Sequence, residues 1–298
     1  MALQPQEKVF PLLLLICALT SILVVILVGV FVFLQGYPVL AKTGFFTFLL
    51  GRSWQPGQGV YGILPMVVGT VVVTLLSLII GVPLGIATAI FLAELAPEGA
   101  AAWTRRAIEL LAGIPSVVYG LFGMVTIVPL VRYIASNWFG AWLSPEMKTG
   151  YGILAASLVL AIMILPTIVS ISEDALRAVP REYKEGSFAL GVPHWQTIVH
   201  VLLPAARSGI IAGVVLGMGR AIGETMAILM VAGNAPALPR SIFSPVRTMS
   251  GNIGLEMGYA SGSHAQALFA TGIVLFLVIM LLNGFALLFT GRRAVRTP

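Results

Sequence analysis

Six long apolar runs constrain this chain more than any other feature of its sequence. A helix needs about 20 mostly apolar residues to cross a hydrocarbon core about 30 Å thick, and its backbone must satisfy its own hydrogen bonds there. The alternating segments of about ten residues that mark an outer-membrane barrel are absent. The sequence therefore predicts an all-α fold, a polytopic membrane helical bundle with six transmembrane helices. The runs lie at residues 10–34, 63–93, 108–134, 151–172, 208–233 and 267–290.

Composition agrees, since 58% of the 298 residues are hydrophobic and 9% are charged, against about 45–50% and about 25% in soluble domains. The first run is longer than the roughly 7–15 residues of a signal-peptide core, and no A-x-A-like cleavage site follows it. We expect it to remain as an anchor. Cys17, the single cysteine, lies in this run, so we expect a buried, inert thiol and no intrachain disulfide.

Lysine and arginine predict the orientation, because they prefer the cytoplasmic side. With a cytoplasmic N-terminus that side would hold Lys8, Arg105, Arg106, Arg177, Arg181, Lys184, Arg207, Arg292, Arg293 and Arg296. The other side would hold Lys42, Arg52, Arg132, Lys148, Arg240 and Arg247. The bias favours two cytoplasmic termini, and the formal charge of +6 then reflects topology rather than nucleic-acid binding.

Glycine and proline predict the connections and the packing. The stretches RSWQPGQGVYG and AGNAPALPRSIFSP are predicted to be ordered connections rather than strands. Small residues at every fourth position let helices approach closely in lipid, and prolines within spans imply kinks or local unwinding. The glycine pairs are Gly81 with Gly85, Gly213 with Gly217 and Gly219 with Gly223, and the prolines are Pro83, Pro115, Pro129 and Pro166.

Residues 185–204, EGSFALGVPHWQTIVHVLLP, predict two short helices on the cytoplasmic side. The first is expected to stop at Gly191, a residue suited to a left-handed C-cap. Pro193 suits the start of the second helix, and Pro204 closes the unit. From physical chemistry alone, a folded linker is as good an interpretation as a binding surface.

The fifth run contains Arg220 near its midpoint and Glu224 four residues later. Charges in mid-membrane are costly and usually face a bundle interior or a water-filled path. On a continuous helix the two side chains would share one face, where they can pair. One interpretation is a self-neutralising clamp between helices. The other is a site for an anion in transit, because a guanidinium offers a fork of donors suited to phosphate-like oxygens.

Other chemistry is excluded or disfavoured. The chain has no G-x-x-x-x-G-K-[ST] phosphate loop, and GMGRAIGE has the wrong glycine spacing and no preceding strand for a dinucleotide site. His194, His200 and His264 have no metal-ligand spacing. Too few ionisable groups lie within the spans for a catalytic site. We therefore expect no catalytic residues, no metal and no cofactor.

The 185–204 segment resembles the EAA-x3-G-x9-I-x-L-P loop of permease subunits in ABC importers. Glu185, Gly186 and Ser187 occupy the EAA places, and Gly191 occupies the glycine place. Val201 stands for the isoleucine, and Leu203 and Pro204 close the pattern. The resemblance implies a coupling helix that docks on a separate cytoplasmic ATPase, within residues 180–205.

From about residue 45 onward the chain resembles PstC-type permease subunits of phosphate importers. The resemblance implies the type I ABC importer permease fold and places the family's paired intramembrane residues at Arg220 and Glu224, with Thr225 beside them in the substrate pathway. A PstA-type sister subunit has a related R-A-x-G-E-T stretch. The motifs that carry the resemblance are GRAIGETMAILMVAGN (219–234), ELLAGIPSVVYGLFG (109–123) and YGILPMVVGT (61–70).

The resemblance implies three expected regions: a first anchor helix with a periplasmic loop, the permease domain and a cytoplasmic tail. It also implies a bacterial inner-membrane assembly with a PstA-type sister permease, two copies of a cytoplasmic ABC ATPase, a periplasmic phosphate-binding protein and membrane lipid. Two alternatives stay open: a permease for another oxyanion such as molybdate or phosphonate, and an ion-coupled secondary transporter with Glu224 as proton carrier. The regions are residues 1–60, 61–291 and 292–298.

Overall fold

The computed structural model describes residues 5–291, and the side-chain surroundings of residues 10–284. Within this range six helical stretches are long and apolar enough to cross a membrane, as predicted. The predicted tail at 292–298 lies outside the described residues, and the division at residue 61 stays a prediction. The six stretches are Phe10–Thr43, Leu64–Leu95, Ser116–Asn137, Pro145–Arg177, His194–Gly223 and Ser263–Gly284.

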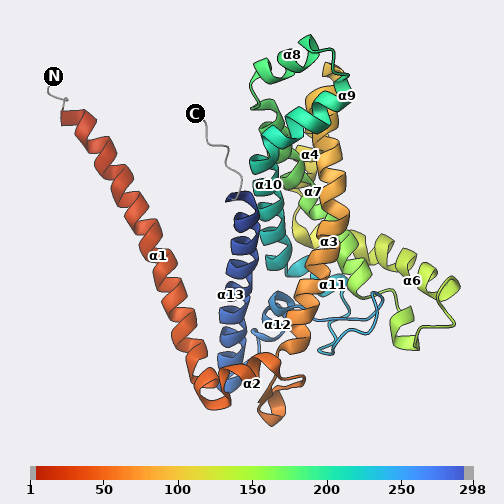
Figure 1. Cartoon of the computed structure of the whole chain (residues 1–298). Helices are drawn as coiled ribbons and strands as arrows, with labels where there is room; N and C mark the ends of the chain where they lie inside the picture. The colour runs from red at the N-terminus through yellow and green to blue at the C-terminus, as the bar shows by residue number, and fades with distance from the viewer. Residues whose placement is uncertain (1–4, 292–298) are drawn as a thin grey trace.

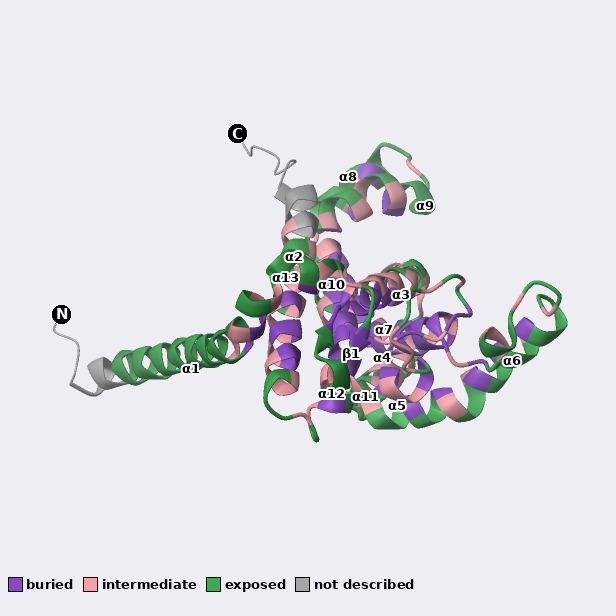
Figure 2. Cartoon of the chain, turned by 90° about the horizontal axis from the view of Figure 1, so that it is seen from below, coloured by how far each residue is buried: buried purple, intermediate pink, exposed green. Residues whose placement is uncertain are grey.

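The centre of the bundle is α7 (Ile153–Arg177), most of whose residues are buried (Figure 2). On either side of it pack α3 (Leu64–Ile90) and α10 (Leu203–Gly223). A Cβ at Gly85 of α3 would lie 2.7 Å from Ile168 Cγ2 of α7, and one at Gly217 of α10 would lie 3.0 Å from Ile168 Cγ1. Glycine thus brings both helices onto α7, which confirms two of the three predicted packing pairs.

The third pair, Gly219 with Gly223, behaves differently. Among the described residues, a Cβ at either position would meet no atom within 4 Å apart from the nearby backbone of α10 itself. With Ala212 and Leu216 these glycines recur three or four residues apart along α10, and the face that they define is only partly covered by this chain. This side of α10 therefore faces away from the described bundle.

The first helix, α1 (Pro5–Thr43), diverges from the bundle over most of its length (Figure 1). It contacts α13 (Ser263–Gly291) near its C-terminal end, where the rings of Phe31 and Phe269 meet edge to face at 5.6 Å. Cys17 is exposed on α1 rather than buried as predicted, because within residues 5–291 no other helix covers that part of α1. Its apolar surface suits lipid acyl chains or a partner helix.

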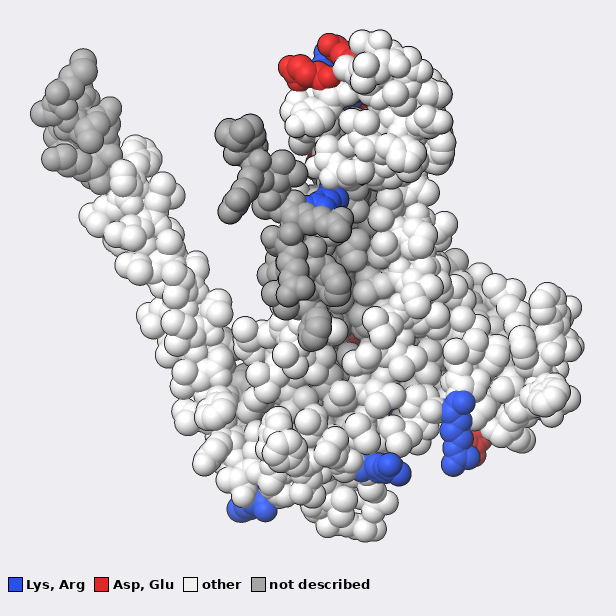
Figure 3. All heavy atoms as spheres, viewed as in Figure 1, with Lys and Arg blue, Asp and Glu red and all other residues white. Residues whose placement is uncertain are grey.

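Two ends of the molecule are distinguished by their charges. The α8 end carries α8 (Arg181–Ala189) and α9 (His194–Thr197), and the hairpin end carries α2 (Phe45–Leu50) and the strands β1 (Trp54–Gln55) and β2 (Val60–Tyr61). Figure 3 shows that most charged side chains on one face gather toward these ends, with a broad uncharged surface between them. This is the surface that a bilayer requires.

The hairpin corrects one prediction. Residues 52–62 were expected to form no strand, but Trp54 pairs with Tyr61 and Gln55 with Val60 in an antiparallel ribbon. Gly59, with φ of 70°, makes the turn, and Gly51 and Gly62 pass so closely that no side chain fits between them. Two residue pairs are too short a ladder to show alternation in the sequence.

The predicted third run, residues 108–134, is interrupted at Pro115, and the membrane-crossing stretch begins after the break, at Ser116. The helix α4 (Glu98–Gly113) ends before Ile114 and Pro115, both extended, and α5 (Ser116–Phe122) follows. The chain continues through a π-helical turn (Gly123–Ile127) into α6 (Val128–Asn137). The Tyr119 hydroxyl donates to the Leu111 carbonyl at 2.7 Å and so bridges the break. Pro83 and Pro166 lie within continuous helices instead, and Pro129 lies in the first turn of α6.

Candidate functional site

The fifth span is also broken, and the break lies beside Arg220. Residues 208–233 were predicted to form one helix, but α10 starts at Leu203 and ends at Gly223. Glu224 is extended, with φ of −66° and ψ of 129°, and a new helix α11 (Met226–Val231) follows Thr225. The Glu224 carboxylate accepts a hydrogen bond from the Ala227 amide at 3.1 Å, so it caps the new helix.

This break separates the two charges that could have paired on a continuous helix. Among the described residues no ion pair joins Arg220 to Glu224, because the extended backbone turns the carboxylate toward α11. In this conformation Arg220 and Glu224 therefore do not form the self-neutralising clamp that was one interpretation of the sequence. Arg220 is half-buried and close enough to Tyr119 of α5 to interact with it electrostatically.

The helix α12 (Met249–Glu256) also contacts the break at Glu224. The Ser250 hydroxyl donates to the Glu224 carbonyl at 2.8 Å, and the Thr225 hydroxyl donates to the Gly223 carbonyl at 3.2 Å. These two contacts satisfy carbonyls that a continuous helix would have used. The sequence predicted Arg220, Glu224 and Thr225 as pathway residues, which stays a prediction, and it gave no local signal for the contact of Ser250.

Residues 180–205, named the coupling segment here after the role that the resemblance implies, fold into the two short helices that the sequence predicted. Helix α8 ends just before Gly191, which has φ of 74° and donates its amide to the Phe188 carbonyl at 2.9 Å. After Pro193 come α9 and a π-helical turn (Ile198–Leu202) that leads into α10. The two short helices are tied by a buried hydrogen bond of 2.9 Å between the hydroxyls of Ser187 and Thr197. Glu185 and Gly186 are exposed.

Leu203 and Pro204 lie at the start of α10, where Leu203 is half-buried and Pro204 is exposed. Leu203 packs against a cluster that includes Ile198 and Leu202 of the π-helical turn. The end of the motif therefore continues directly from the coupling segment into the helix that carries Arg220. Large apolar side chains remain uncovered on the other side of the segment, among them Tyr183, Phe188, Leu190 and Trp195.

Glu94 connects the coupling segment to α3, and sequence reasoning missed this role. It lies in the π-helical turn Phe91–Leu95 that extends α3. Its carboxylate binds Lys184 of α8, and Nε2 of His194 lies 3.4 Å from the same oxygen. One carboxylate thus contacts both short helices, a long-range arrangement that no local pattern predicts.

A second carboxylate organises the same end of the bundle. Glu173 of α7 is buried and binds Arg105 of α4 as well as Arg177, whose Nε lies 2.8 Å away. Arg177 also donates to the Leu92 carbonyl at 3.0 Å. The hydrogen bond to Glu173, followed by the charge of that carboxylate, raises the pKa of Arg105 above its ordinary value. Three helical segments are therefore joined beneath the coupling segment.

The chain is similar in sequence to a family of transport proteins and to several of its members. Residues 81–295 match the model of the family described as "Binding-protein-dependent transport system inner membrane component". The chain is 42% identical over 246 residues to the phosphate transport system permease protein PstC of Pasteurella multocida, which covers 78% of this chain and 76% of the relative. It is 40% identical over 277 residues to the probable ABC transporter permease protein YqgH of Bacillus subtilis, covering 90% and 86%.

Solved structures share the fold. A permease chain of a bacterial ABC transporter involved in the import of alginate aligns with a TM-score of 0.65 at 16% identity, covering 97% of this chain and 99% of that one. A chain of the MetNI methionine ABC transporter aligns with a TM-score of 0.54 at 20% identity, covering 78% and 95%. The chain has the type I ABC importer permease fold, and it belongs to the family of binding-protein-dependent transport system inner membrane components, among the PstC-type permeases.

Proposed function

We propose that this chain forms half of the translocation pathway of an ATP-driven phosphate importer. The observation that carries the proposal is Arg220, a half-buried guanidinium beside a helix break, with no carboxylate paired to it in the described structure. A planar fork of donors suits the oxygens of phosphate. Relatives named as phosphate transport permeases, at 42% and 37% identity, support the choice of anion.

The surroundings of Arg220 support a pathway rather than a closed core. Among the described residues no neighbouring atom lies within 4 Å of a Cβ placed at Gly219 or Gly223, and Gly223 is exposed. A PstA-type sister permease would cover that face and leave the pathway between the two subunits. Because Arg220 and Glu224 flank Gly223, an anion that passes there would meet both side chains.

The proposed partners follow from the two ends of the molecule. Two copies of an ABC ATPase would bind the α8 ends of this chain and its sister, where Tyr183, Leu190 and Trp195 form an exposed apolar surface. A periplasmic phosphate-binding protein would bind the hairpin end. This chain would hydrolyse no ATP itself and would need no cofactor or metal.

The orientation follows from the same assignment. The coupling segment is cytoplasmic if it binds the ATPase, and the Pro5 end of α1 and the Gly291 end of α13 point toward that end of the bundle (Figure 1). Both termini would then be cytoplasmic in a bacterial inner membrane, in agreement with the bias of lysine and arginine.

The anion is tested by competition. Membrane vesicles that contain the whole transporter should take up labelled phosphate, and unlabelled phosphate should suppress this uptake at far lower concentrations than molybdate or a phosphonate. Stronger suppression by molybdate or phosphonate would assign another oxyanion to this permease. Family membership already favours an importer over the ion-coupled alternative.

Replacing Glu224 by glutamine should weaken the discrimination of phosphate from sulfate. Glutamine keeps a side-chain oxygen for the Ala227 amide, so the cap survives, while the charged acceptor for a hydrogen bond donated by hydrogen phosphate is lost. A charge-assisted hydrogen bond contributes about 1.5–3 kcal/mol, so sulfate competition should strengthen about tenfold or more. Glu146→Gln, at an exposed site of the hairpin end, is the control. Identical sulfate competition curves for Glu224→Gln and the parent would reject this role.

Replacing Glu94 by glutamine should loosen the connection between the coupling segment and α3. Glutamine keeps the shape but loses the charge that holds Lys184 and His194. A partly exposed ion pair contributes up to about 1 kcal/mol, so phosphate transported per ATP hydrolysed should fall severalfold. The exposed Glu98 provides a matched control as Glu98→Gln. Unchanged coupling in Glu94→Gln would contradict the role assigned to Glu94.

A further inference from the structure

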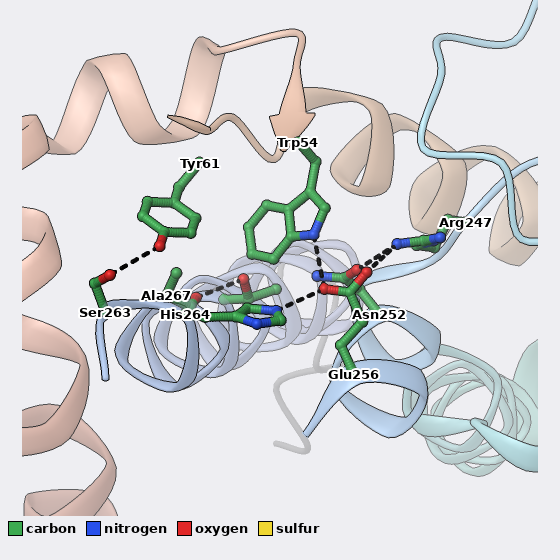
Figure 4. Close-up of polar contacts among 9 residues, drawn as sticks. Trp54, Tyr61, Arg247, Asn252, Glu256, Ser263, His264 and Ala267 are labelled. Carbon is green, nitrogen blue, oxygen red and sulfur yellow. Dashed lines mark hydrogen bonds and ion pairs between the residues drawn. The ribbon is translucent and has the colours of Figure 1, made fainter. Parts of the chain in front are cut away.

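A buried carboxylate lies at the hairpin end, at the last residue of α12. Glu256 is 6% exposed and its two oxygens meet three nitrogen atoms (Figure 4). Arg247 Nη1 lies 2.6 Å from Oε1, while Trp54 Nε1 donates to Oε2 at 2.9 Å and His264 Nε2 lies 2.8 Å from the same oxygen. Because an ionised carboxylate only accepts hydrogen bonds, all three partners act as donors here.

These partners come from three separate parts of the chain. Trp54 belongs to the hairpin strand β1, 202 residues away from Glu256 in sequence. His264 lies in the first turn of α13, and its ring meets that of Trp54 edge to face at 6.2 Å. Arg247 precedes α12 and also donates to the Asn234 carbonyl at 2.9 Å. Glu256 therefore joins α12 to the hairpin, to α13 and to the connection that follows α11.

The other end of α12 lies against the broken fifth span. Ser250 holds the Glu224 carbonyl, and the Met249 amide donates to Thr70 Oγ1 of α3 at 2.9 Å. A Cβ at Gly254 would lie 4.0 Å from Cβ of Thr225 and 2.5 Å from its Cγ2. With threonine at 225, only glycine at 254 allows α12 to lie this close to the break, whereas cysteine at 225 lacks the Cγ2 methyl that makes the 2.5 Å contact.

The length of α12 makes its position dependent on such contacts. A helix of eight residues is too short to be stable alone, since isolated helices shorter than about 12–15 residues are marginal in water. A buried carboxylate is tolerated only where donors surround it. The contacts of Glu256 thus fix the C-terminal end of α12. Along its length the helix packs against the break at Glu224 and Thr225.

We propose that Glu256 is a positioning residue for the translocation pathway: by binding Arg247, Trp54 and His264 it fixes α12 against Glu224 and Thr225 and so sets the orientation of the Glu224 carboxylate. That Glu224 and Thr225 line a pathway rests on the proposed function, whereas the effect of Glu256 on the position of α12 against these residues does not. Glu256 itself touches no transported ion in this account.

A pair of engineered cysteines measures this dependence directly. Cys17 is the single native cysteine, so Cys17→Ser gives a background without thiols. The pair Thr225→Cys and Gly254→Cys then places two Cβ atoms 4.0 Å apart, within the roughly 3.5–4.5 Å that a disulfide requires. In membranes that contain the whole transporter, a mild oxidant should cross-link this pair rapidly.

Adding Glu256→Gln to the cysteine pair should slow cross-linking about tenfold, because it leaves the buried Arg247 without its counter-charge and frees α12 to move. Glu146→Gln should leave the rate unchanged. Trp54→Phe removes one donor and keeps the ring, so it should slow cross-linking less than Glu256→Gln. If Glu256→Gln does not assemble, the cross-linking rate of Trp54→Phe is the test: slower cross-linking than in the parent supports the proposal, and the parent rate overturns it. Cross-linking at the parent rate in the assembled variant would overturn the proposal.

Two further readouts separate positioning from general loss of stability. Arg247→Gln and Glu256→Gln break the same contact, so the double variant should cross-link about as slowly as Glu256→Gln alone, whereas additive effects would contradict the proposal. In the parent chain, Glu256→Gln should lower the rate of phosphate uptake per assembled transporter without changing the amount of bound ATPase. A transporter for another anion would still show the cross-linking result, so failure of the phosphate assignment and failure of this inference are distinguishable.

Discussion

Replacing Arg220 by glutamine should reduce phosphate uptake to the background of cells without the transporter. The Arg220 guanidinium is half-buried, and no carboxylate of the described structure is paired with it, so its donors are free for an anion. A charge-assisted hydrogen bond contributes about 1.5–3 kcal/mol, and loss of two such bonds should slow transport by about two orders of magnitude or more. Uptake of labelled phosphate, normalised to the amount of transporter in the membrane, measures the effect.

Two other substitutions sharpen this result. Arg220→Lys keeps the charge but loses the planar fork, so it should retain part of the activity. Arg240→Gln makes the same change at an exposed residue of the hairpin end and should leave uptake intact. All variants should bind the ATPase normally, because Arg220 is remote from α8 and α9 in the fold. Parental uptake by Arg220→Gln would remove this residue from the pathway.

Replacing Gly191 by valine should separate the permease from its ATPase. Gly191 has φ of 74°, a conformation that costs an ordinary residue about 1–2 kcal/mol and is a genuine outlier for a β-branched one. The turn between α8 and α9 would have to change, and the apolar surface around Leu190 and Trp195 would change with it. We expect at least about a tenfold loss of ATPase affinity, measured by copurification from membranes, and a matching loss of uptake.

The same segment offers a matched control. Gly186 lies within α8, and a Cβ at this position would meet no atom within 4 Å. Gly186→Ala should therefore keep ATPase binding, and alanine is also the residue that the EAA pattern has there. Normal copurification of the ATPase with Gly191→Val would show that the turn does not determine the docking surface.

Local signals predicted the parts of the molecule that depend on local chemistry. The apolar runs identified the spans because the bilayer sets their length, and Gly191 with Pro193 identified the two short helices of the coupling segment. Pro115 marked the break in the predicted third run. The break at Glu224 gave no such signal, because Gly223 and Thr225 are common in membrane helices and hydropathy continues across them.

The contacts that hold the site together lie beyond local patterns. The hairpin was wrongly predicted as strand-free, since two residue pairs show no alternation. Glu94 with Lys184 and Trp54 with Glu256 are 90 and 202 residues apart, and only the packing of the helices brings them together. Pairing of Arg220 with Glu224, one of the two interpretations of the sequence, required a continuous helix, whereas Glu224 has extended backbone.

The most direct test of the account uses sealed vesicles that contain this chain, its sister permease and the ATPase, with the phosphate-binding protein on the opposite side from the ATPase. The account predicts phosphate uptake that requires ATP and every partner and that disappears with Arg220→Gln. Uptake by this chain alone, driven by a proton gradient without ATP, would contradict it.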